Sequence, residues 1–150
     1  MNNFKLILFI LITGLSVSLI FAQQNKITKL DNTKQENVSA KVILTEIEKG
    51  ISRGNVDALS KNLSPQTYFS LSNGTRGYYS SNQAYYILED FFKMYQVVTF
   101  RFQTVQAEEG NPYATGTYVY EFKGKRVSAQ VYISLKNIGK SWKITQITFN

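Results

Sequence analysis

The chain has 150 residues, a formal net charge of +7, no cysteine and no histidine. The missing cysteines exclude disulfides, and the missing histidines remove the commonest general base and the usual zinc ligand. Because the lysines are scattered rather than clustered, the positive charge predicts a solvated surface and no nucleic-acid partner, with an anionic partner as the alternative.

The first 22 residues have the pattern of a secretory signal peptide. Lys5 is their only charge, an apolar run follows from Leu6, and Ala22 is a small residue suited to cleavage before Gln23. The alternative is an uncleaved membrane anchor, but the run is shorter than the roughly 20 residues that a spanning helix needs. We therefore predict export to the periplasm or the medium, with no stable membrane insertion. The predicted organisation is a signal peptide at 1–22, a flexible leader at 23–38 and one domain at 39–150.

Two helices are predicted at the start of this domain. Apolar residues repeat at helical spacing from Ala40 to Ile51, and Gly54 is placed to end that helix in a left-handed cap. Asn55 can cap a second, shorter helix, which Pro65 stops.

A short strand, a turn and a long helix are predicted next. Residues 66–72 favour extended backbone, Asn73-Gly74 predicts a turn, and residues 75–79 can pair back. Ser80 and Gln83 then form a capping-box pattern at the start of a helix over 80–95. Its apolar positions share one side: Ala84, Ile87, Leu88, Phe91 and Tyr95.

After that helix the apolar period changes to two, which predicts four strands joined by hairpins. In the first strand we expect Val98, Phe100 and Phe102 to face the core. Lys123-Gly124 predicts a tight turn, residues 127–135 should form a central strand, and a slip in apolar phase predicts a bulge near Thr145-Gln146. The fold class is therefore α+β, with helices on one face of a strongly bent antiparallel sheet in the order α-α-β-(β)-α-β-β-β-β.

This order resembles the nuclear-transport-factor-2-like, or cystatin-like, superfamily. The resemblance covers about residues 39–150 and includes the glycine corner at 54–59 and the final Trp142-Lys143-Ile144. It implies a cone whose sheet wraps the long helix, a pocket at the open end, and frequent pairing through the outer sheet face. A narrower family of exported bacterial domains of unknown function is similar at Tyr79-Ser80, Gln83-Ala84, Phe91-Phe92, 113–116 and Lys123-Gly124.

The ten tyrosines and ten phenylalanines indicate an aromatic pocket or an ordinary aromatic core. The leading hypothesis is a non-catalytic domain that binds a small apolar or amphipathic ligand, or a protein partner, through the cone pocket. The candidate pocket residues are Tyr78, Tyr79, Tyr85, Tyr118 and Tyr120.

An enzyme of isomerase or dehydratase type is the first alternative. The resemblance implies it, because superfamily enzymes such as ketosteroid isomerase and scytalone dehydratase use pocket carboxylates with tyrosine or histidine. Asp57 is expected in the first turn of the short helix, where the helix dipole stabilises a carboxylate. Asp90 is expected on the surface, and Glu121 could pair across strands with Arg101. No converging acid and base is visible, and no phosphate loop or metal-ligand cluster is present, so we predict no catalytic residue, no metal and no cofactor.

A dimerisation or scaffold module of the cell envelope is the second alternative. The outer sheet face is predicted to carry a mixed polar surface of the kind that can pair with a second copy. Its residues are Thr99, Arg101, Thr117, Val119, Ser128, Gln130 and Tyr132.

Overall fold

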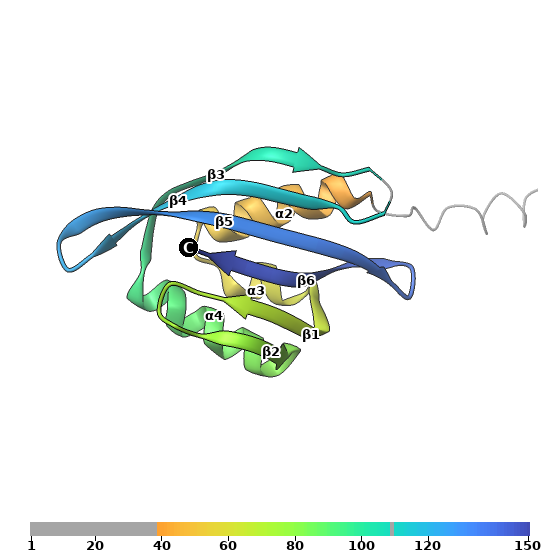
Figure 1. The fold of residues 1–150 in the computed structure, drawn as a ribbon, viewed down its shortest axis with the longest axis horizontal. Coiled ribbons are helices and arrows are strands. Elements are labelled where there is room, and N and C mark those ends of the chain that lie inside the picture. Colours follow the sequence, from red (N-terminus) through yellow and green to blue (C-terminus); the bar gives the residue numbers. More distant parts are fainter. Residues whose placement is uncertain (1–38, 109) are drawn as a thin grey trace, which may run out of the picture. The chain divides into compact units, whose positions relative to one another are not determined.

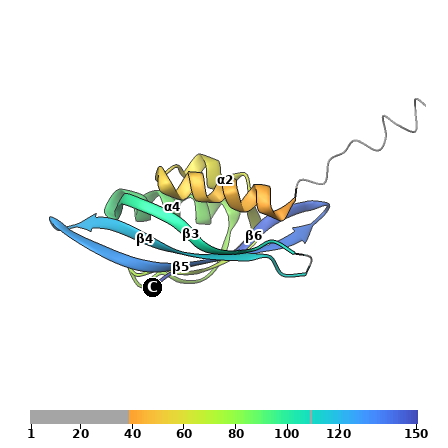
Figure 2. The same cartoon turned by 90° about the horizontal axis from the view of Figure 1, so that it is seen from above.

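Three helices lie on one side of a six-stranded sheet in the computed structural model, which describes residues 39–108 and 110–150 (Figures 1 and 2). The strand order is β2-β1-β6-β5-β4-β3. The predicted signal peptide at 1–22 and leader at 23–38 lie outside the described residues. Within these residues no helix has the length and apolar character needed to cross a membrane.

Helices α2 (Ala40–Ser52) and α3 (Val56–Ser60) meet at the predicted glycine corner. Gly54 has a φ of 58°, and the Asn55 side chain accepts a hydrogen bond from the Ala58 N–H at 3.1 Å, so both predicted caps are confirmed. The predicted apolar stripe of α2 is buried: Ala40, Ile43, Leu44, Ile47 and Ile51.

Strands β1 (Leu63–Ser70) and β2 (Arg76–Ser80) pair antiparallel, as predicted. β1 begins earlier than expected, since Pro65 lies inside it, at an irregularity in its pairing with β6. That pairing is parallel, whereas the sequence predicted an antiparallel sheet throughout. Thr67 Oγ1 donates to the Ile144 carbonyl at 3.0 Å, and the Ile144 N–H donates to the Asn62 carbonyl at 2.6 Å, so the bulged segment of β1 keeps its contact with β6.

Helix α4 (Ser81–Met94) begins with the predicted capping box. The Ser80 N–H donates to Gln83 Oε1 at 3.0 Å, while the Ser80 hydroxyl accepts from the Gln83 N–H. The predicted apolar side packs into the core, and Phe92 joins it with 7% of its surface exposed.

The last four strands form an antiparallel meander: β3 (Gln96–Gln106), β4 (Tyr113–Phe122), β5 (Lys125–Ile138) and β6 (Ser141–Phe149). Lys123 and Gly124 both have positive φ, which confirms the tight β4–β5 turn. Ser134 faces Gln146 and Leu135 faces Ile144, so Thr145 is the extra residue of the predicted bulge.

The expectation that Val98 faces the core is wrong. The β3–β4 register shifts between Val97 and Thr99, so that Val97 packs against the core and Val98 is 42% exposed. A second shift follows between Phe102 and Thr104. Each shift turns the following side chains to the other face, which alternation in the sequence does not reveal.

Side chains of α2 hydrogen-bond to the free edge of β3. Glu48 Oε1 accepts from the Phe102 N–H at 2.8 Å, and Ser52 Oγ donates to the Phe100 carbonyl at 3.1 Å. An unpaired strand edge is a template for aggregation, so these contacts, together with the bulges, protect it.

We expect Glu48→Ala to lower the free energy of unfolding by about 1–3 kcal/mol, because it leaves a partly buried N–H without its charged acceptor. Urea unfolding of the variant measures this loss. Glu46→Ala, an exposed position on the same helix, is the control and should change stability by no more than about 0.5 kcal/mol. Equal losses in the two variants would contradict the role given to Glu48.

Candidate functional site

An aromatic cluster fills the space between α4 and the inner face of the sheet. Tyr118 is fully buried, with its ring centroid 5.1 Å from that of Phe149, and Phe91 lies 4.8 Å from Phe149. The Tyr118 hydroxyl donates to the Tyr95 carbonyl at 2.5 Å. These side chains are core, and the surface hollows described below contain none of them.

Burial raises the pKa of Tyr118, and the neighbouring Tyr120 adds to the effect. The folded state therefore holds this proton at a pH where the unfolded chain, with a tyrosine pKa of 10.0, has lost it. The resulting stability is fully present below pH 10 and is lost as the pH rises above it.

We expect the free energy of unfolding to fall between pH 10 and pH 12 less steeply in Tyr118→Phe than in the original chain. Near neutral pH the same variant should lose about 1–2 kcal/mol, because the Tyr95 carbonyl loses its donor. Denaturant titrations at several pH values measure both effects. Parallel pH profiles for the two proteins would contradict the assignment.

The structure does not bring the five candidate tyrosines together. Tyr118 and Tyr120 are buried in the core, and Tyr79 is half-buried with its ring 5.9 Å from that of Phe69. Tyr85 faces α3, while Tyr78 is 72% exposed on the other side of the sheet. Alternation within β2 already places neighbouring tyrosines on opposite faces. Binding of a ligand by this set stays a prediction.

One of these tyrosines meets a candidate carboxylate in an open hollow. Tyr85 Oη donates to Asp57 Oδ1 at 2.9 Å, which links α4 to the first turn of α3. This hydrogen bond, followed by the charge of Asp57, raises the pKa of Tyr85. Arg53 and Lys93 also line the hollow. A phenol that holds its proton more tightly, on an exposed surface, is a poor acid–base catalyst.

The other candidate carboxylates are exposed. Asp90 lies on the outer side of α4, as predicted. The expected pairing of Glu121 with Arg101 is wrong, because Glu121 faces Gln96 and Arg126 whereas Arg101 faces Thr117. Across the described residues, no three acidic, histidine or cysteine side chains gather in a way that could hold a metal ion.

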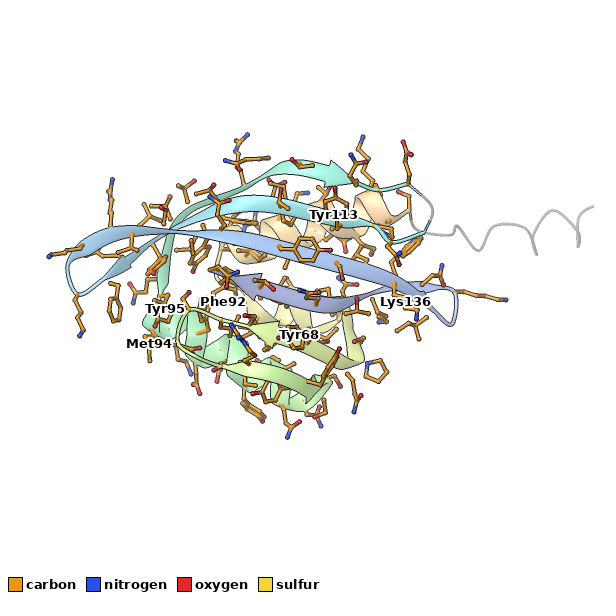
Figure 3. The ribbon with its side chains drawn as sticks, viewed as in Figure 1. Tyr68, Phe92, Met94, Tyr95, Tyr113 and Lys136 are labelled. Atoms are coloured by element: carbon orange, nitrogen blue, oxygen red, sulfur yellow. The ribbon has the colours of Figure 1, made fainter. Side chains whose placement is uncertain are left out.

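The side of the sheet away from the helices is open. Figure 3 is drawn from this side and labels Tyr68, Tyr113 and Lys136 on it. The cross-strand register places the predicted outer-face residues together, with Thr117 between Arg101 and Gln130, and Val119 between Thr99 and Ser128.

Part of this open side is an uncharged surface, which we call the outer patch. It consists of Thr115, Thr117, Val119, Gln130 and Tyr132 on β4 and β5. Gln130 Nε2 donates to Thr117 Oγ1 at 3.3 Å, and the Tyr132 ring stacks on Tyr113 with centroids 5.7 Å apart. Arg101 on β3 faces Thr117, and Arg126 lies two residues from Ser128 on β5, so charged residues flank the patch on two sides.

A family model described as a domain of unknown function (DUF4783) matches residues 44–150. A DUF4783 family protein from Bacteroides uniformis has a TM-score of 0.65 at 15% identity, with 71% of this chain and 94% of that chain covered. One from Bacteroides ovatus has a TM-score of 0.61 at 18% identity, with 69% and 90% covered. No curated protein matches the chain.

Other similar structures share the fold and have different descriptions. A hypothetical protein from Catenulispora acidiphila with a ketosteroid isomerase-like fold, in complex with trimethylamine, has a TM-score of 0.57 at 14% identity. The alignment covers 72% of this chain and 83% of that one. At such identities these similarities establish the nuclear-transport-factor-2-like fold, and a shared fold does not imply a shared function.

Proposed function

The chain belongs to the DUF4783 family of domains of unknown function, and we propose that it is a non-catalytic protein-binding domain whose outer patch pairs with a second copy of itself. The uncharged outer patch on a strongly basic chain is the observation that carries this proposal. The expected export would place the pair in the periplasm or outside the cell.

Charge is the first support for self-pairing. Two copies that each have a formal net charge of +7, or +6 once Lys5 leaves with the predicted signal peptide, repel one another over most of their surfaces. The outer patch itself adds nothing to this repulsion, because Thr115, Thr117, Val119, Gln130 and Tyr132 are all uncharged. Depletion of charge at the centre, with a charged rim, is typical of protein interfaces.

The chemistry of the patch is the second support. Two-fold pairing places the same surface of each copy against the other. Every hydrogen-bond donor on the surface must therefore find an acceptor within an identical set of side chains. Hydroxyl and amide groups both donate and accept, and Thr117, Gln130 and Tyr132 supply them here. Tyrosine also adds a large, half-buried apolar ring.

The packed core argues against the small-molecule form of the binding hypothesis. Tyr118, Phe91 and Phe149 occupy the inner side of the sheet with almost no exposed surface. A site for an apolar ligand needs a concave, largely enclosed cavity. The protein-partner form does not need one.

Sedimentation equilibrium over a range of concentrations tests the proposal. We expect the chain from residue 39 onward to behave as a dimer, and Thr117→Arg to behave as a monomer, because the variant places two added charges at the interface. Thr45→Arg adds the same charge on the exposed side of α2 and should leave the dimer intact. A monomer at all concentrations, or equal effects of the two variants, would overturn the proposal.

A further inference from the structure

A hollow on the open side of the sheet lies beside the outer patch, toward β1 and β2, and Ser134 of its lining is two residues along β5 from Tyr132 of the patch. Its volume is about 470 Å³. Its lining includes Tyr68, Tyr78, Ser134, Lys136 and Gln146, together with Thr145. Tyr78 is one of the five candidate pocket residues, and Thr145 and Gln146 lie at the predicted bulge of β6.

The β6 bulge builds one wall of this hollow. Adjacent residues of a regular strand point to opposite faces, yet Thr145 and Gln146 both line the hollow, because Thr145 is the extra residue opposite Ser134. Ser134 Oγ lies 3.1 Å from Thr145 Oγ1, and Gln146 Nε2 donates to Thr148 Oγ1 at 3.2 Å. The bulge therefore gathers hydroxyl and amide groups that a regular strand would separate.

Two aromatic rings form the opposite wall. Tyr68 and Tyr78 are cross-strand partners on β1 and β2, and their ring centroids lie 5.1 Å apart at 60°. Tyr78 is 72% exposed even though it contacts Tyr68, so most of its large apolar ring remains uncovered. Its ring therefore offers an apolar surface beside a set of neutral polar groups.

We propose that this hollow binds a saccharide that carries a carboxylate, such as a chain of uronic acid residues. A sugar ring has an apolar C–H face, which packs on an aromatic ring, and a rim of hydroxyls, which pair with groups that both donate and accept. Ser134, Thr145 and Gln146 are such groups.

Charge selects the acidic class of sugar. Lys136 is the charged residue of the lining, and no aspartate or glutamate faces it there. An ammonium forms a strong hydrogen bond with a carboxylate. The open, shallow form of the hollow suits a polar oligosaccharide, whereas an apolar ligand would require enclosure.

Titration of the chain with tetragalacturonate, and with maltotetraose as the neutral counterpart, tests this inference. We expect saturable binding of tetragalacturonate at physiological ionic strength, at least tenfold weaker in Tyr78→Ala. Lys136→Gln should remove the preference for tetragalacturonate over maltotetraose. Chemical-shift changes should map to β1, β2 and the β6 bulge.

Matched variants separate this site from general charge attraction. Tyr86→Ala removes a tyrosine that is 64% exposed on α4, and Lys125→Gln removes a lysine at the far end of β5, so both should bind tetragalacturonate unchanged. Thr117→Arg should also bind it, because the inference does not rest on dimerisation. Absence of saturable binding, equal affinity for both tetrasaccharides, or equal losses in Tyr78→Ala and Tyr86→Ala would overturn the proposal.

Discussion

Phe91→Ala is expected to lower the free energy of unfolding by about 3–5 kcal/mol. Phe91 has no exposed surface, and its ring lies 4.8 Å from both Tyr95 and Phe149. Removal of the ring leaves a cavity that the surrounding aromatic side chains cannot close without breaking their own contacts. Urea unfolding monitored by circular dichroism measures the loss.

Phe91→Leu is the control for this prediction, because it keeps the site apolar and removes less volume; its loss should be clearly smaller. A loss below about 1 kcal/mol in Phe91→Ala would mean that the inner side of the sheet is loosely packed. That result would restore the small-ligand hypothesis, since a loosely packed interior can admit a guest.

Gly116→Ala is expected to destabilise the domain by about 1–3 kcal/mol or more. A Cβ atom at this position would lie 2.3 Å from the Arg101 carbonyl oxygen. The obstacle is backbone of β3 rather than a flexible side chain, so relief requires separation of two paired strands. Thermal unfolding of the variant measures the effect.

Ser128→Ala, at an exposed position on β5, serves as the control for Gly116→Ala and should change stability by no more than about 0.5 kcal/mol. Unchanged stability in Gly116→Ala would contradict the close approach of β3 to β4.

Features that depend on neighbouring residues were predictable from the sequence. The helix stripe that begins at Ala40, the capping box at Ser80 and the corner at Gly54 each depend on residues within a few positions of one another. The bulge at Thr145 was also predictable, because it changes the phase of the apolar pattern within its own strand.

Features that depend on distant pairing were not predictable. Val98 was assigned to the core because it continues the alternation of Phe100 and Phe102. The register shift that exposes it arises from the pairing of β3 with β4, which the local pattern does not contain. The parallel pairing of β1 with β6 joins residues far apart in the sequence, and local patterns do not encode strand direction.

The candidate site was predictable only in part. Alternation correctly placed Thr117, Gln130 and Tyr132 on the outer face, since period two is a local property. It could not group Tyr78 with Lys136 and Gln146, because that hollow requires four strands brought together by the fold. The five candidate tyrosines were grouped by residue type, and type alone does not determine position.

Isotope-filtered NMR on a mixed sample of labelled and unlabelled chains tests the central claim most directly. It detects contacts between copies and assigns them to residues. Our account predicts intermolecular signals from the methyl groups of Thr115, Thr117 and Val119. Absence of such signals at concentrations where the chain is folded, or signals that arise from α2 instead, would contradict it.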